Sequence, residues 1–169
     1  MIMKGSFEEF ANRISSMDDL DLSDFASLCD EMKVNCHLAV MRQPYLDYVL
    51  SGEKKVESRF SKVPCAPYKK VKKGDIIVFK ETGGPLRAVS MVIDVSFFGN
   101  IDSRKNMTLL LGHKDELMIS DDFIEKKKDS KYVSIMYLDK VIPIHCVNLI
   151  KNDMRSWVVF DYDSNGRLF

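Results

Sequence analysis

The chain has 169 residues, of which 46% are hydrophobic and 30% are charged, so it is long enough to bury one hydrophobic core. Its 25 lysine and arginine residues balance its 25 aspartate and glutamate residues, so the formal net charge is zero and no overall field attracts polyanions. No apolar run approaches the ~20 residues that span a bilayer, and residues 1–10 lack the apolar core of a secretory signal. We expect a soluble, cytoplasmic protein without membrane contact.

Two short amphipathic helices are predicted near the N-terminus, because apolar residues recur there at positions i, i+3, i+4 and i+7. They are Phe7, Phe10, Ala11 and Ile14 in the first helix, and Phe25, Leu28, Cys29 and Met32 in the second. Two short helices cannot form a core alone. We therefore predict that residues 1–35 are a helical extension of a domain formed by residues 36–169.

From residue 37 onward the pattern favours strands, at 37–41, 55–60, 76–79, 89–97, 132–138, 141–144 and 157–160. A helix beginning at Pro44 and ending near Gly52 interrupts them, and further helical pieces are predicted at 107–111 and 121–127. The strands do not alternate regularly with helices. This order favours the α+β class, with a small, mostly antiparallel β-barrel and peripheral helices.

The cysteines give no sign of a disulfide framework or a metal site. Cys29, Cys36, Cys65 and Cys146 are dispersed without CxxC spacing, so we expect reduced thiols. Two of them adjoin a histidine, but neighbouring residues of a strand point to opposite faces. We expect no metal, and no dinucleotide or Walker motif indicates a cofactor.

Charge is distributed unevenly along the chain. Residues 54–73 contain eight lysine and arginine residues and one glutamate, whereas residues 1–33 contain three basic and eight acidic residues. The basic stretch is a candidate for binding phosphates, because each phosphate that is neutralised releases counterions. The acidic stretch is a candidate for contacting a basic protein partner, or this chain's own basic segment.

Residues 52–59 read Gly-Glu-Lys-Lys-Val-Glu-Ser-Arg, which is the pattern GxKxxExR, directly after the proline-initiated helix. The octet resembles the ASCH domain, a branch of the PUA-like barrels. Three further segments, beginning at Ala66, Asp129 and Arg155, follow in the family's order, so the resemblance covers about residues 37–160. It implies a PUA-like barrel and leaves residues 1–35 as an added element.

Strand geometry places Glu57 and Arg59 on one face of the predicted strand, with Val56, Ser58 and Phe60 on the core side. A carboxylate beside a guanidinium serves equally well as a structural pair or as a hydrogen-bonding edge for a base or phosphate. Both interpretations stay open. The resemblance implies that Lys54 borders a central cleft, where its ammonium would bind a phosphate or act as a base.

Other candidate ligand contacts lie outside the octet. They are Tyr45 for stacking on a base, Lys69, Lys70, Lys72 and Lys73 for phosphates, and Lys80, Glu81 and Thr82, which the resemblance places near the cleft mouth. Each has a simpler alternative, namely a helix-face residue, a solvated loop and a tight turn. Trp157 is expected in the core.

The resemblance leaves three functions open. The first is binding of RNA, or of a nucleotide or nucleoside, at the GxKxxExR motif. The second is a hydrolase, either a ribonuclease or similar to acetylcytidine amidohydrolases, with Lys54 and Glu57 as catalytic candidates. That machinery has a threonine three residues after the lysine, and Glu57, which stands there instead, cannot be a hydroxyl nucleophile. The third is a protein-interaction module that uses the acidic N-terminal helices.

Overall fold

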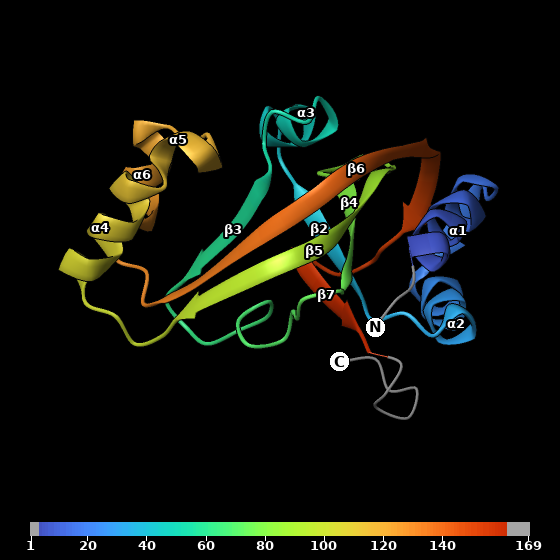
Figure 1. Cartoon of the computed structure of the whole chain (residues 1–169), viewed down its shortest axis with the longest axis horizontal. Helices are drawn as coiled ribbons and strands as arrows, with labels where there is room; N and C mark the ends of the chain where they lie inside the picture. Colours follow the sequence, from blue (N-terminus) through green and yellow to red (C-terminus); the bar gives the residue numbers. More distant parts are fainter. Residues whose placement is uncertain (1–3, 162–169) are drawn as a thin grey trace.

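The computed structural model describes residues 4–161. They form a twisted sheet with helices at both of its ends (Figure 1). The helices are α1 (Lys4–Ser15), α2 (Leu22–Met32), α3 (Tyr45–Leu50), α4 (Ser103–Gly112), α5 (Lys114–Leu117) and α6 (Asp121–Lys127). The strands are β1 (Asp19–Asp21), β2 (Cys36–Met41), β3 (Val56–Ser61), β4 (Ile76–Glu81), β5 (Leu86–Phe98), β6 (Tyr132–Ile150) and β7 (Trp157–Phe160). None of these helices is long and apolar enough to cross a membrane.

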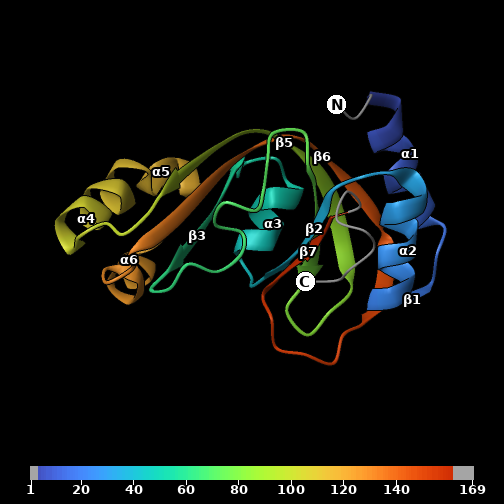
Figure 2. The same cartoon turned by 90° about the horizontal axis from the view of Figure 1, so that it is seen from below.

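The seven strands form one sheet in the order β1-β6-β5-β4-β2-β7, and β3 pairs with the first part of β6. The pairs β1/β6 and β2/β4 are parallel, and the other strand pairs are antiparallel. The predicted α+β class with a mostly antiparallel sheet is confirmed. The sheet curls (Figure 2) but stays open, because within residues 4–161 the strand β3 pairs with β6 alone.

β6 differs from its prediction, because the two strands expected at 132–138 and 141–144 are one continuous strand of 19 residues. Pro143 lies in its middle, opposite Ala88 of β5, near a shift in the register of the two strands. Between residues 138 and 147 the described structure gives β6 only β5 as a partner. A proline, which has no N–H to donate, is tolerated where a strand has one free side.

The helices α1 and α2 pack on the sheet end opposite to α4–α6 (Figures 1 and 2). Their aromatic residues Phe7, Phe10 and Phe25 share one buried cluster with Leu38 of β2 and Ile76 of β4. Their charged side chains pair locally, as Arg13 does with Glu31, or with β6, as Glu8 does with Lys140. The domain boundary at residue 35 stays a prediction, and the two helices contribute to the core of the sheet.

The helices α4–α6, inserted between β5 and β6, cover the outer face of β3. Val56 and Phe60 of β3 pack into a cluster with Leu110 of α4, Leu117 of α5 and Ile124 of α6. Because side chains alternate along a strand, Glu57 and Arg59 point to the opposite face of β3. That face lies toward Trp157, which belongs to a second buried cluster.

Candidate ligand-binding site

Glu57 and Arg59 lie together on β3, as the strand spacing predicts. Oε1 of Glu57 is 3.3 Å from Nε of Arg59 and also accepts a hydrogen bond of 3.0 Å from the backbone N–H of Ser58. That N–H lies on the edge of β3 that has no strand partner in the described structure. The Glu57 side chain therefore satisfies an edge donor and holds the guanidinium at the same time.

Three groups hold the guanidinium of Arg59. Besides Glu57, the carbonyl of Val40 on β2 accepts a hydrogen bond of 3.1 Å from Nη2, and the guanidinium carbon lies 5.0 Å from the ring centroid of Trp157 on β7. This distance is within the range of a cation–π interaction. The Nη1 group has no hydrogen-bond acceptor among residues 4–161. The Arg59 side chain, which is 21% exposed, is thus oriented by the protein and keeps donors for a ligand.

Glu57 also has an unused acceptor. The residue is 3% exposed, and its Oε2 atom is buried without a hydrogen-bond partner in the described structure. Buried carboxylate oxygens are normally hydrogen-bonded, because desolvation without a partner is costly. This acceptor belongs to the carboxylate whose other oxygen lies 3.3 Å from Nε of Arg59, which suits a ligand edge that presents both a donor and an acceptor.

Lys54 precedes β3 and is 3% exposed. Its ammonium donates a hydrogen bond of 2.6 Å to the carbonyl of Leu117, at the C-terminal end of α5, and lies 5.9 Å from the ring centroid of Tyr45. Burial lowers the pKa of Lys54, the positive charge of Arg59 lowers it further, and the negative charge of Glu57 opposes both effects. Lys54 therefore belongs to the same electrostatic group as the pair on β3.

Two cations that sequence reasoning missed complete this group. Burial lowers the pKa of Lys127 at the end of α6, and the positive charges of Arg59 and Arg42 lower it further, so Lys127 lies within electrostatic range of both arginines. Neither Arg42 nor Lys127 forms an ion pair with another described residue. They come from distant parts of the chain and match no motif. We call Arg42, Lys54, Glu57, Arg59 and Lys127 the β3 site.

Tyr45 contributes to the β3 site from within the protein. Its ring lies edge-to-face against Phe123 of α6, with the centroids 6.0 Å apart, and one face is directed to Lys54. The ring is half-buried and bridges two of the hydrophobic clusters. In this arrangement Tyr45 supports Lys54.

The predicted phosphate-binding lysines Lys69, Lys70, Lys72 and Lys73 are exposed in the loop between β3 and β4. Lys70 and Lys72 line a shallow hollow that also includes His37 and Asp75. His37 cannot act as a base there, because Nε2 is hydrogen-bonded to Asp75 and Nδ1 accepts from Trp157. The loop is a basic surface separate from the octet.

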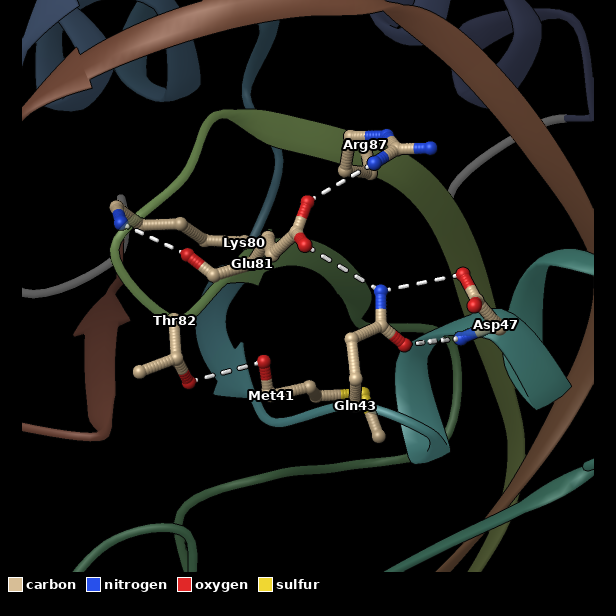
Figure 3. Close-up of polar contacts among 7 residues, drawn as sticks. All are labelled: Met41, Gln43, Asp47, Lys80, Glu81, Thr82 and Arg87. Atoms are coloured by element: carbon tan, nitrogen blue, oxygen red, sulfur yellow. Dashed lines mark hydrogen bonds and ion pairs between the residues drawn. The ribbon is translucent and has the colours of Figure 1, made fainter.

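Lys80, Glu81 and Thr82 lie at the end of β4, and their polar atoms contact the protein itself (Figure 3). Glu81 is bound by Arg87 at 2.9 Å and by Gln43 at 3.4 Å, and the Thr82 hydroxyl donates to the carbonyl of Met41 at 3.0 Å. Lys80 donates to the carbonyl of Glu81 at 3.0 Å. Burial lowers the pKa of Lys80, and the charge of Lys151 adds to this effect. Through these contacts the β4–β5 turn is hydrogen-bonded to the segment that precedes α3.

Metal ligands are not gathered anywhere in the described part of the chain, since no three histidine, cysteine or acidic side chains there are placed to hold an ion. Cys29 and Cys36 are buried free thiols, and Cys65 and Cys146 are exposed ones. Burial raises the pKa of the Cys36 thiol well above its ordinary value, so this group stays protonated.

Comparison with solved structures finds ASCH proteins. A serine-to-alanine variant of the ASCH protein from Zymomonas mobilis superposes with a TM-score of 0.56 at 14% identity, over 72% of this chain and 85% of that chain. The ASCH structure from Zymomonas mobilis without that substitution gives 0.52 at 16% identity, over 67% and 73%. No family model and no curated protein sequence matches the chain. These likenesses show that the fold is of the ASCH type.

Proposed function

We propose that this chain, which has the ASCH-type fold, binds single-stranded RNA at the β3 site. In this proposal Arg42, Arg59 and Lys127 hold phosphate groups, and Glu57 Oε2 accepts a hydrogen bond from the edge of an unpaired base. The phosphate contacts are extended along the RNA by the exposed lysines Lys69, Lys70, Lys72 and Lys73.

The observation that carries the proposal is that the Arg59 guanidinium is already oriented by the protein and still has a free donor group. Three protein groups orient its guanidinium, and yet Nη1 has no acceptor among the described residues. A receptor that is already oriented loses little conformational entropy when a ligand binds. Arginine binds phosphate through a planar, two-pronged set of donors, so the geometry suits a phosphate oxygen at Nη1.

The surrounding charges support the same ligand. The positive charges of Arg42 and Arg59 repel Lys127, and neither Arg42 nor Lys127 forms an ion pair with a described residue, so a phosphate placed beside Lys127 relieves this repulsion. Glu57 gives the site a negative group as well, because its free oxygen accepts hydrogen bonds from N–H donors and repels phosphates. The site therefore does not bind anions alone. A nucleotide provides both an N–H donor on its base and a negative charge on its backbone.

The test is a titration of short fluorescent single-stranded RNA, followed by anisotropy, at low and high salt of about 50 and 300 mM. We expect wild-type affinity to fall steeply with salt and Arg59→Gln to weaken binding about tenfold, since it removes a charged hydrogen bond. Arg13→Gln is the matched control, because Arg13 is an arginine at the opposite end of the sheet. Absence of wild-type binding at low salt would refute the proposal.

A second candidate function is hydrolysis, and it is favoured by Lys54. Burial lowers its pKa, which moves a lysine toward the unprotonated form that a general base requires. The substrates to test are acetylcytidine, whose amide bond would be cleaved, and RNA. Product formation by the wild type that disappears in Lys54→Met, with an unchanged circular dichroism spectrum, would establish it. Turnover that persists in Lys54→Met excludes Lys54 as the base.

A further inference from the structure

A chain of buried hydrogen bonds runs behind the β3 site. The indole Nε1 of Trp157 donates to Nδ1 of His37 at 3.0 Å, and Nε2 of His37 lies 2.8 Å from Oδ2 of Asp75. The same Asp75 oxygen accepts a hydrogen bond of 2.9 Å from the backbone N–H of Lys72. Trp157, His37 and Asp75 are 5%, 1% and 4% exposed, so solvent does not compete for these bonds.

The chemistry of the groups fixes the direction of each hydrogen bond. An indole N–H can only donate, so Nδ1 of His37 must be the acceptor. The imidazole therefore carries its proton on Nε2 and donates it to the Asp75 carboxylate. Each nitrogen of His37 has one partner, which determines both the tautomer and the orientation of the ring.

This chain joins the two basic regions. At one end Trp157 presents the face of its indole to Arg59, whose guanidinium carbon lies 5.0 Å from the ring centroid. At the other end Asp75 holds the backbone of Lys72, in the loop that carries the exposed lysines. His37 holds the edge of the indole through the Nε1 hydrogen bond. The face of the indole is therefore held in the orientation in which it contacts the Arg59 guanidinium.

We infer that His37 is the positioning residue of the β3 site, which orients Trp157 from behind and thereby holds the Arg59 guanidinium in place for a ligand. The effect on RNA rests on the proposed function, whereas the effect on Arg59 does not. A purely structural network would contribute to stability and leave the Arg59 side chain unchanged. The two cases therefore differ in what Arg59 does when His37 is replaced.

The test compares three variants in the full chain. His37→Phe removes both hydrogen bonds, and His37→Gln is the conservative variant because an amide provides one acceptor and one donor. Leu28→Ala is the control for lost stability, since Leu28 is a buried residue of α2 in another cluster. Three quantities are measured: the urea midpoint, the hydrogen-exchange rate of the Arg59 Nε–H by NMR, and RNA affinity. The Arg59 signal is assigned by its absence in Arg59→Gln.

We expect His37→Phe to accelerate Arg59 Nε–H exchange about tenfold and to weaken RNA binding by a similar factor, with partial recovery in His37→Gln. Leu28→Ala should lower the urea midpoint without either effect. The inference is overturned if Arg59 exchange in His37→Phe changes no more than in Leu28→Ala. If the wild type binds no RNA, the proposed function fails while the exchange rates still decide the inference. If His37→Phe does not fold, Trp157→Phe replaces it, since it removes the N–H donor together with part of the indole and keeps an aromatic face.

Discussion

Arg59 of β3 lies over the indole of Trp157 of β7, so one side chain bridges two strands that do not pair in the described sheet. The same guanidinium donates to the carbonyl of Val40 on β2, which pairs with β7. A side chain thus takes the place of backbone pairing at the open part of the sheet. This bridge makes the fold and the candidate site depend on each other.

A double-mutant cycle measures this bridge. Arg59→Gln and Trp157→Leu each lower the free energy of unfolding, and we expect their effects to be non-additive by about 1 kcal/mol, because each single change already removes the cation–π contact. Urea denaturation of the wild type, both single variants and the double variant gives the coupling. Additivity within the error of the measurement would show that the contact contributes nothing.

The packing of β3 on the helical insertion gives a second prediction. Phe60→Ala leaves a cavity between β3 and α4–α6, and we expect it to lower the free energy of unfolding by about 3–5 kcal/mol. Val63→Ala is the matched control close by, because Val63 is exposed and its truncation should change stability by less than about 0.5 kcal/mol. Equal urea midpoints for the two variants would contradict the packing.

Periodicity was sufficient to predict the β3 arrangement, because a strand has a side-chain period of two and places Glu57 beside Arg59 whatever the rest of the fold does. The strands rich in branched apolar residues likewise predicted the sheet. Arg42 and Lys127 could not be found this way, since only tertiary packing brings Lys127 near Arg42 and Arg59. No local pattern marks them.

His37 and Trp157 show a different limit of sequence reasoning. The sequence correctly predicts Trp157 in the core, where it is 5% exposed, and makes no prediction for His37, which is 1% exposed. Burial alone does not reveal that one is hydrogen-bonded to the other, or that the indole face supports Arg59. Such a pairing needs the register of β2 against β7, which is antiparallel and is set by strands far apart in the chain.

The stability of the protein should depend on pH through Lys54. Its pKa is lowered in the folded state by burial, so between that value and the ordinary lysine value of about 10.5 the unfolded chain binds more protons. The free energy of unfolding contributed by Lys54 therefore rises with pH through this window. We expect Lys54→Met to remove this part of the rise, measured as the difference in urea midpoints near neutral and alkaline pH.

Charge removal at Glu57 should act on the same lysine. The negative charge of Glu57 raises the pKa of Lys54, opposing burial and Arg59. Glu57→Gln therefore lowers this pKa further, which NMR of the lysine side chain would detect as titration at lower pH. Glu53→Gln is the control, since Glu53 is exposed in the preceding turn. An unchanged Lys54 titration in Glu57→Gln would mean that the two groups do not interact.

Lys127 provides the sharpest test of how the β3 site would hold RNA. In the proposed function its ammonium neutralises a phosphate, so Lys127→Gln should weaken binding of all sequences alike and reduce the slope of log affinity against log salt by about 1. Lys140→Gln is the matched control, because Lys140 is paired with Glu8 beside α1. A salt slope equal to that of the wild type would remove Lys127 from the binding surface. A loss confined to one RNA sequence would instead place Lys127 at a base.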